Sequence, residues 1–308
     1  MAKYRSSVIH EIPVHDADDD EASAAAEASD VADRSIGSII GEARNLDATQ
    51  IERILAYQRE HGLRFGEAAV TLGYATHDDV MFALSRQFHY PYAPQERRNA
   101  CPELVTLNKP FSAQAEAFRA VRSQLMVRLY AEPERRDALA VVSPQSGDGR
   151  SYFAANLAVA LAQLGGRTLL VDADLRRPRQ HEVFGLQARS GLSGILAGRA
   201  ESNVIQQVPG IASLFVLPVG AVPPNPVELV ERPAFGLLTR ELLTKFDHVV
   251  VDTPAAASGS DFAVIAARCG ASLLLARRHQ SRLGDLREVS DTLGQGASRT
   301  VGVVVNEF

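Results

Sequence analysis

The sequence predicts an α/β fold with a doubly wound, mostly parallel sheet, preceded by a small all-helical domain and a disordered acidic N-terminal tail. Three observations lead to this prediction. From residue 138 on, the 308-residue chain alternates short apolar runs with helical stretches, residues 35–87 contain an internal repeat, and the first 34 residues are acidic and poor in large apolar groups. A chain of this length is long enough for two domains.

The apolar runs are predicted strands, and each is continuous instead of alternating with polar residues: 138–143, 168–174, 214–220, 248–254, 272–278 and 300–306. A strand that is apolar on both faces is typical of a sheet covered on both sides. Helical stretches separate the runs, and strand–helix–strand order favours parallel pairing. One further helix is predicted from Gln114 to Tyr130.

The internal repeat becomes visible when the chain is shifted by 29 residues. Matched positions are then Gly37 with Gly66, Ile40 with Ala69, Ile51 with Val80, Leu55 with Leu84, and Gln58 with Gln87. Each copy predicts a short helix, a turn and a second helix, which begins after an N-cap at Asp47 or Thr76. The tandem predicts a small all-helical domain over residues 35–92.

The acidic tail covers residues 1–34, which carry nine Asp or Glu and three Lys or Arg. The net charge of the tail is therefore −6, whereas the net charge of the whole chain is −5. Such a segment buries too little apolar surface to order itself, so we expect a disordered, solvated tail. Residues 93–112 have no sustained periodicity and are expected to be a linker to a domain over residues 113–308.

Composition excludes several classes of protein. The remainder of the chain is near neutral at +1, so the basic footprint of a nucleic-acid-binding protein is absent. Only Cys101 and Cys269 are present, without paired ligand spacing, which speaks against a zinc site and favours a reducing compartment. No apolar run approaches the roughly 18 residues of a membrane span, and the N-terminus lacks the apolar core of a signal peptide. We therefore expect a cytoplasmic protein.

A glycine-rich turn joins the first predicted strand to a helix that begins near Arg150, within the stretch VVSPQSGDGRS. Gly147 and Gly149 let the backbone turn its N–H groups inward, and the helix N-terminus adds positive potential. Ser151 offers a hydroxyl to a magnesium ion. The pattern predicts a P-loop in which arginine replaces the usual lysine. Taken alone, an ordinary strand–helix turn stays open as an alternative.

Carboxylates end two of the predicted strands. Asp172 and Asp174 lie two residues apart, so strand periodicity puts them on one side of the strand end, and Asp252 ends another strand. The carboxyl ends of buried parallel strands meet at the sheet edge where ligands of such folds bind. Three acids at this edge repel one another unless a cation is present, and magnesium on a nucleotide supplies one.

With these features, residues 111–308 resemble the cytoplasmic catalytic domain of bacterial tyrosine kinases (BY-kinases), the chain-length determinants of exopolysaccharide and capsule synthesis. The matching segments are SGDGRS, ANLAVALAQLGGRTLLVDADLRRPRQHEVF, GLSGILAG, LPVGAVPPNPVELV and FDHVVVDTPAA. The double acid followed by RRP, together with PPNPVEL, argues against the ParA/MinD partitioning relatives. Those relatives carry a further lysine early in the loop, where this chain has Gln145.

The resemblance implies an ATP- and Mg²⁺-dependent protein tyrosine kinase and assigns roles to individual residues. Asp174, which accepts a proton from a tyrosine hydroxyl, and Arg150 are the expected catalytic residues. The expected metal-site residues are Ser151, Asp172, Asp174 and Asp252. The expected nucleotide-binding residues are Gly147, Asp148, Gly149, Arg150, Ser151, Tyr152 and Asn306, although Asn306 could equally be a plain polar cap of the last strand.

Two departures from the family pattern bear on activity. Arg150 carries a planar guanidinium group with several donors, whereas the usual lysine carries a compact ammonium group. Both neutralise phosphate oxygens but with different geometry, so we expect ATP binding to be retained and phosphoryl transfer to be altered. The family usually ends in a tyrosine cluster that is autophosphorylated, whereas all seven tyrosines here precede residue 153. Three alternatives stay open: another tyrosine such as Tyr90 or Tyr92 is used, the substrate is another protein, or kinase activity is vestigial.

Glu116, Arg119 and Arg122 form an E-x-x-R-x-x-R motif, and steps of three residues keep them on one helix face. In the resembling family this motif joins subunits into a ring, so a homo-oligomer is expected. A solvated charged face with an internal Glu–Arg pair is the alternative. The family also implies a separate inner-membrane polysaccharide co-polymerase, or chain-length regulator. Its cytosolic tail would activate the kinase and hold it at the inner face of the membrane.

The repeat units 35–58 and 64–87 resemble the N-terminal domain of type II secretion and pilus ATPases, some of which bind cyclic-di-GMP. The second copy matches closely, whereas the first has Ser35 for the usual arginine and Arg44 for the usual glycine. Glycines such as Gly66 and Gly73 would let the backbone approach a guanine or a phosphate. Cyclic-di-GMP binding is therefore a hypothesis for this regulatory domain, and protein docking is its alternative.

The sequence as a whole favours an ATP-dependent protein tyrosine kinase that controls exopolysaccharide polymerisation, chain length and export. The alternative is a nucleotide-gated ATPase or scaffold that controls polymerase assembly with little or no tyrosine kinase activity.

Overall fold

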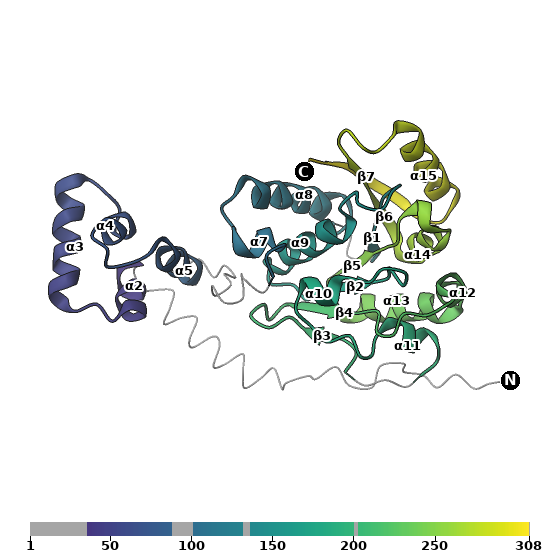
Figure 1. Cartoon of the computed structure of the whole chain (residues 1–308), viewed down its shortest axis with the longest axis horizontal. Coiled ribbons are helices and arrows are strands. Elements are labelled where there is room, and N and C mark those ends of the chain that lie inside the picture. Colours follow the sequence, from purple (N-terminus) through teal and green to yellow (C-terminus); the bar gives the residue numbers. More distant parts are fainter. Residues whose placement is uncertain (1–35, 88–100, 132–135, 200–202, 308) are drawn as a thin grey trace. The chain divides into compact units, whose positions relative to one another are not determined.

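The structure, a computed structural model, describes residues 36–87, 101–131, 136–199 and 203–307 (Figure 1). The predicted tail and the candidate phosphoacceptors Tyr90 and Tyr92 lie outside the described residues. The chain divides into two compact units, a helical one within residues 13–93 and an α/β one from residue 94 on. We describe each by itself.

The α/β unit is built on a seven-stranded sheet with the order β3-β4-β2-β5-β1-β6-β7, in which only β3 runs antiparallel to its neighbour. The strands are β1 (Ala138–Val142), β2 (Thr168–Asp172), β3 (Gln206–Gln207), β4 (Leu214–Leu217), β5 (His248–Asp252), β6 (Gly270–Arg277) and β7 (Arg299–Asn306). All six predicted strands are present. The edge strand β3 was not predicted because two glutamines carry no apolar signal.

Helices cover both faces of the sheet, as the doubly wound prediction requires (Figure 1). One face is covered by α9 (Arg150–Ala162), on which α7 (Val105–Asn108) and α8 (Ala113–Arg128) pack. The other face is covered by α13 (Pro233–Lys245), α14 (Asp261–Cys269) and α15 (Leu283–Gln295). Shorter helices lie in the connections: α10 (Gln180–Val183), α11 (Leu192–Leu196), α12 (Pro226–Glu231) and the 3₁₀ turn η1 (Ala256–Ser258). Among the described helices, none is both long and apolar enough to cross a membrane.

Residues 101–112 are more ordered than a linker prediction implies. Leu104 and Leu107 are buried around α7, and the Thr106 amide donates to the Asn156 side chain on α9 at 3.1 Å. Thr106 and Asn156 are 50 positions apart, so the local periodicity of residues 101–112 could not predict this contact. This half of the expected linker 93–112 is thus part of the α/β unit.

The helical unit consists of α2 (Ile36–Arg44), α3 (Ala48–His61), α4 (Phe65–Thr71) and α5 (His77–Gln87), which are the two helix pairs that the repeat predicts. The predicted N-caps are confirmed. The Gln50 amide donates to the Asp47 carboxylate at 2.8 Å, and the Asp79 amide donates to the Thr76 hydroxyl at 3.3 Å. The core of the unit is small and consists of Ile39, Ile40, Ile54, Ala68, Ala69, Ala75 and Ala83.

The repeated glycines of this unit serve helix packing. A Cβ atom at Gly37 would lie 3.3 Å from the ring of Phe65, and one at Gly66 would lie 2.7 and 3.1 Å from the two methyl groups of Val80. The expected reason for glycine at position 66, close approach of a ligand, is therefore not needed to explain it. Arg44, which replaces the usual glycine, donates from Nε to the Asp79 carboxylate at 2.7 Å and ties α2 to α5.

We predict that Gly66→Ala destabilises the helical unit by about 1–3 kcal/mol, since both methyl groups of Val80 crowd the new Cβ and rotation of the valine cannot relieve both. Thermal unfolding of the full chain followed by circular dichroism measures the effect. Gly284→Ala on α15 is the matched control, because its Cβ meets nothing within 4 Å and alanine favours the helix by up to about 1 kcal/mol. Equal or higher stability of Gly66→Ala would contradict the packing role.

Candidate active site

The glycine-rich turn follows β1 and leads directly into α9. Gly147 and Gly149 have φ angles of 88° and 93°, a left-handed conformation in which a side chain is strained. Asp148, expected to contact the nucleotide, is buried and fixed by the protein. Its carboxylate accepts from the Gln145 amide at 2.8 Å and from the Ser281 hydroxyl at 2.9 Å. Asp148 thus holds the loop in shape through Gln145 and Ser281.

Arg150 occupies the position of the usual P-loop lysine, and its guanidinium is buried within the protein. Its Nε donates to the Thr253 carbonyl at 2.9 Å, and its Nη1 donates to the Gln145 carbonyl at 2.9 Å and to the Ser143 hydroxyl. Its Nη2 lies 4.0 Å from the Asp174 carboxylate. A planar fork with five donors can make these contacts at once, whereas an ammonium group cannot. Arg150 therefore ties the loop to the end of β5.

The predicted meeting of carboxylates at the sheet edge is clearest for β2 and β5. Asp172 and Asp252 are directly opposite in the strand register, and both are fully buried. Asp172 Oδ2 accepts from the backbone amides of Arg179 and Gln180, at 3.1 and 2.9 Å, and Asp252 Oδ2 accepts from the Gln180 side-chain amide at 2.7 Å. Within the described structure, Oδ1 of each aspartate has no hydrogen-bond partner.

Burial of this pair shifts its titration. Loss of hydration raises the pKa of Asp252 to about 6, although the charge of Arg150 and hydrogen bonds from Gln180 and Ser151 act in the opposite direction. Burial, together with the negative charge of Asp252, raises the pKa of Asp172 well above its ordinary value. The free protein therefore disfavours two adjacent negative charges, and a cation at this point relieves the repulsion.

Asp174 lies just past the end of β2, and its carboxylate is held by the chain that follows it. Its Oδ1 accepts from the amides of Arg176 and Arg177, at 3.1 and 2.9 Å. Its negative charge is one of the smaller causes of the raised pKa values of Asp172 and Asp252, after their burial. The Arg176 side chain forms an ion pair, with Nε 2.7 Å from the Asp261 carboxylate.

The donor set of Ser151, Asp172 and Asp252 suits a magnesium ion that also binds water and substrate phosphates. Among the described residues, no group of three or more His, Cys, Asp or Glu side chains is placed to enclose a metal. Mg²⁺ commonly takes only one or two carboxylates and completes its shell with water and substrate phosphates. The unpartnered Oδ1 atoms of Asp172 and Asp252, with the Ser151 hydroxyl at the start of α9, are suited to that arrangement.

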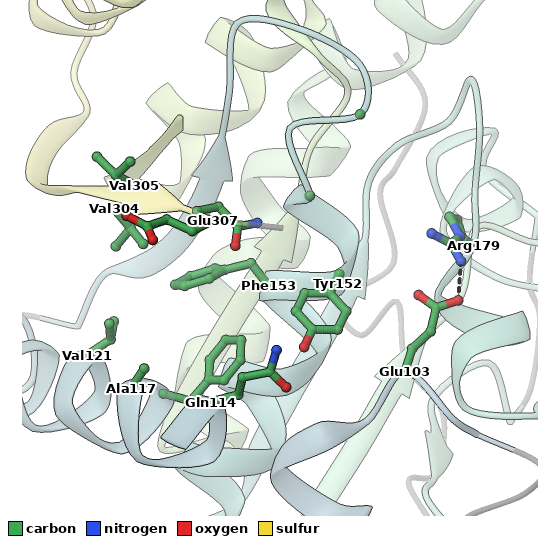
Figure 2. Close-up of a pocket in the computed structure, with 14 residues that line it drawn as sticks. Glu103, Gln114, Ala117, Val121, Tyr152, Phe153, Arg179, Val304, Val305 and Glu307 are labelled. Atoms are coloured by element: carbon green, nitrogen blue, oxygen red, sulfur yellow. Dashed lines mark hydrogen bonds and ion pairs between the residues drawn. The ribbon is translucent and has the colours of Figure 1, made fainter. Parts of the chain in front are cut away.

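A cavity of about 700 Å³ adjoins the loop. Figure 2 shows Tyr152 and Phe153 of α9, Ala117 and Val121 of α8, and Val304 of β7 around it. Its lining residues are Glu103, Gln114, Ala117, Phe118, Val121, Gly147, Gly149, Tyr152, Phe153, Arg179, Val304, Val305, Asn306 and Glu307. Its apolar, aromatic walls beside the glycine turn suit a planar heterocycle whose phosphates reach the loop.

Besides Gly147 and Gly149 of the loop, two further predicted nucleotide-binding residues, Tyr152 and Asn306, lie in this cavity wall. Burial and the negative charge of Glu103 raise the pKa of Tyr152, which keeps its phenol protonated at neutral pH. Asn306, at the end of β7, donates to the Asp148 carbonyl at 3.3 Å, so it contacts the loop as well as lining the cavity. The structure therefore places both residues in the wall of one cavity beside the loop, and their contact with a nucleotide stays a prediction.

The predicted oligomerisation residues on α8 all make contacts within the chain. Glu116 and Arg119 form an ion pair at 2.7 Å, and Arg119 also donates to the Pro110 carbonyl at 2.6 Å. Arg122 donates to the Ala160 carbonyl at 2.8 Å. The internal Glu–Arg pair that we kept as an alternative is therefore present, and ring formation stays a prediction.

Three residues of the site were not predicted. Gln180 bridges the paired acids, Thr253 accepts from Arg150 through its backbone, and Asp261 binds Arg176. Gln180 follows directly on the RRPR run, but a glutamine after a strand exit carries no pattern of its own. Asp261 lies 85 residues after its partner Arg176, and the two meet only through the fold.

Comparison with known proteins shows what this chain resembles. The family profile for the CobQ/CobB/MinD/ParA nucleotide binding domain matches residues 139–308. CapB of Staphylococcus aureus is 31% identical over 213 residues, which are 69% of this chain and 92% of CapB. Tyrosine-protein kinase CpsD of Streptococcus agalactiae is 30% identical over 193 residues, 62% of this chain and 82% of CpsD. Tyrosine-protein kinase wzc of Salmonella typhi is 30% identical, but the match spans only 28% of wzc.

Solved structures give the same likeness. The kinase domain of Escherichia coli tyrosine kinase ETK superimposes with a TM-score of 0.63 and 32% identity, over 66% of this chain and 79% of that one. The chimerical protein CapA2B2 superimposes with a TM-score of 0.62 and 30% identity, over 72% of this chain and 96% of that one.

We predict that Asp252→Asn stabilises the nucleotide-free protein at neutral pH. Because the pKa of Asp252 is about 6 when folded and 3.8 ordinarily, the folded state binds more protons and stability falls as pH rises from about 4 to 6. Asparagine removes this loss, which is worth ~3 kcal/mol above pH 6. Chemical denaturation between pH 4 and 8 should show the two proteins converging at the acid end. Exposed Asp291→Asn is the control, and a constant offset for Asp252→Asn would contradict the linkage.

Proposed function

Because the chain belongs to the CobQ/CobB/MinD/ParA nucleotide-binding family and, within it, to the bacterial tyrosine-protein kinases, we propose that it transfers the γ-phosphoryl group of ATP to tyrosine. The observation that carries this proposal is the pair of buried acids, Asp172 and Asp252, beside the glycine turn. A buried like-charge pair with unpartnered oxygens is expected at a site that takes a cation with its substrate.

The nucleotide is proposed to bind with its two ends in different surroundings. The amides around Gly147 and Gly149 and the first turn of α9 receive the phosphates, since donors and helix dipole both favour anions there. The cavity lined by Tyr152 and Asn306 receives the base. The apolar wall and the protonated Tyr152 phenol support an uncharged aromatic ring, and the choice of ATP rests on the family resemblance.

Magnesium, when bound with the nucleotide, supplies charge neutralisation for the transferring phosphoryl group. Ser151, Asp172 and Asp252 are proposed to hold it, directly or through water. Asp174 is proposed to accept the proton of the attacking tyrosine hydroxyl as the oxygen–phosphorus bond forms and the bond to the β-phosphate breaks. Two backbone amides fix Asp174 Oδ1, and Oδ2, which lies 4.0 Å from Arg150 Nη2, is the atom proposed to receive the proton.

Arg150 is proposed to support nucleotide binding by holding the loop as well as by its charge. Its contacts to the carbonyls of Gln145 and Thr253 join the two segments that flank the phosphate position. A guanidinium committed to these oxygens is less free to follow the phosphoryl group than a lysine ammonium. This difference supports retained ATP binding with altered transfer.

The biological role proposed for the kinase is control of exopolysaccharide polymerisation, chain length and export, which rests on the family. With it we propose a homo-oligomer, organised through Glu116, Arg119 and Arg122, and a cytoplasmic protein at the inner face of the membrane. An inner-membrane co-polymerase is the proposed activating partner. Glu116 remains 69% exposed in its side chain despite its ion pair, so a neighbouring subunit can reach it.

A second candidate function is a nucleotide-gated ATPase or scaffold that controls polymerase assembly with little tyrosine transfer. It is favoured by the arginine at position 150, which stands in place of the usual P-loop lysine. The two candidates share nucleotide binding and differ in whether a tyrosine is phosphorylated.

For the helical unit we propose regulation, with cyclic-di-GMP as ligand and protein docking as the alternative. The tandem of capped helix pairs supports the likeness to the N-terminal domain of type II secretion and pilus ATPases. Of the three residues with packing roles, Gly37 and Arg44 lie in the first copy and Gly66 lies in the second, so the first copy has fewer of these positions left for a dinucleotide. The second copy is therefore the half that we expect to bind.

We predict that Asp174→Asn abolishes phosphotyrosine formation while nucleotide binding stays within about threefold, because the amide keeps the hydrogen bonds to residues 176 and 177 but cannot take a proton. Mass spectrometry of the full chain after incubation with ATP, Mg²⁺ and the partner's cytosolic tail reads out phosphotyrosine. The Asp291→Asn variant is the control. ATP-dependent changes in oligomer size without phosphotyrosine in the unmodified protein would instead favour the scaffold.

Isothermal titration of the full chain with cyclic-di-GMP tests the proposed regulation. We expect saturable heat in the micromolar range that is lost in Arg64→Ala, at the start of the second repeat, and kept in Arg44→Ala of the first. No heat at millimolar dinucleotide would end this hypothesis and leave protein docking.

A further inference from the structure

Gln180 lies where the chain returns to the acid pair. It is fully buried at the start of α10, and its backbone amide donates to Asp172 Oδ2 at 2.9 Å. Its side-chain Nε2 donates to Asp252 Oδ2 at 2.7 Å and to the Ser151 carbonyl at 3.1 Å. One residue thus joins the ends of β2 and β5 to the first turn of α9.

The segment that delivers Gln180 wraps the two acids of the β2 exit with its own amides. Residues 176 and 177 donate to Asp174 Oδ1, and residues 179 and 180 donate to Asp172 Oδ2. The position of Gln180 is therefore set by the same short segment that orients the proposed base. A shift of this segment would move both carboxylates together.

The acceptor oxygen of Gln180 is unsatisfied. Among the described residues, nine buried side-chain nitrogen or oxygen atoms have no hydrogen-bond partner, and three of them belong to this one group: Asp172 Oδ1, Asp252 Oδ1 and Gln180 Oε1. A buried unpaired polar atom costs on the order of 1–3 kcal/mol. Three acceptors left open on contacting residues point to a donor or cation that binds there.

A purely structural glutamine does not account for this arrangement. The two Nε2 hydrogen bonds explain how Gln180 stabilises the fold, but they leave Oε1 buried without a partner. When both carboxylates are ionised, all three open atoms are acceptors, so a group that binds them must be positively charged or rich in O–H donors. A hydrated magnesium ion has both properties.

We propose that Gln180 is a positioning residue of the magnesium site. Its N–H group holds the carboxylate of Asp252 in place, and its Oε1 accepts a hydrogen bond from water bound to the ion. The inference rests on the proposed function, because it concerns the cation that accompanies the nucleotide. Outer-shell partners of this kind orient metal ligands and tune metal affinity.

The test is Gln180→Met, which keeps the length of the side chain and removes both polar atoms. The affinity of the full chain for fluorescent ADP is measured across a Mg²⁺ titration and again in EDTA. We expect the Mg²⁺ concentration for half-maximal enhancement to rise about 10- to 100-fold, while metal-free ADP affinity changes less than about twofold. The Gln180→Asn variant, which keeps an amide one methylene shorter, should fall between the two proteins.

Gln206→Met is the matched control, because that glutamine also donates its amide to a backbone carbonyl, but on the edge strand β3. An unchanged Mg²⁺ titration in Gln180→Met would overturn the inference. So would an equal loss of ADP affinity with and without Mg²⁺, which is the signature of a merely structural role. If Gln180→Met does not fold, Gln180→Asn decides by the same two criteria. Failure of the unmodified protein to bind ADP with Mg²⁺ would reject the proposed function itself.

Discussion

The parallel pairing of β2 with β5 forces the carboxylates of Asp172 and Asp252 into one buried space. In-register strands place opposite residues side by side, and two helix-covered faces exclude the water that would otherwise screen the charges. The raised pKa values of both acids are the direct result of this geometry. A site built in this way is destabilised when empty and ionised, and the free energy that it gains from a cation is correspondingly larger.

Arg150 and Gln180 make such a pair tolerable, and they do so differently. The positive charge of Arg150 partly offsets the burial that raises the pKa of Asp252. The hydrogen bonds of Arg150 go to backbone and hydroxyl oxygens. The neutral amide of Gln180 binds Asp252 directly. Arg150 therefore compensates the negative charge of Asp252, whereas Gln180 holds the Asp252 carboxylate in place. The hydrogen bonds of Arg150 to the Gln145 and Thr253 carbonyls fix its guanidinium between the loop and the end of β5.

Most of the α/β unit and part of the site could be predicted because the sequence patterns that indicate them involve residues close together in the chain. Six apolar runs, the glycines at 147 and 149, and acids at strand ends each mark their own position in the sequence. The residues that escaped prediction act across the fold. Gln180 reaches a strand 72 positions away, and Thr106 meets Asn156 at a separation of 50. In the helical unit the repeat predicted the helices and caps, but the close contact of Gly66 with Val80 needed the packed structure.

The first turn of α9 connects the two parts of the proposed nucleotide site. Successive residues of a helix point about 100° apart, so Arg150 and Ser151 lie beside the acids while Tyr152 and Phe153 line the cavity. Binding at the phosphate end depends on charge, and binding at the base end depends on apolar surface from α8 and β7. Because different forces and different neighbours act at each end of the proposed site, we expect a change from lysine to arginine to alter the phosphate contacts and to leave the base cavity intact. This separation is the physical argument for the proposal that the loop with Arg150 binds a nucleotide.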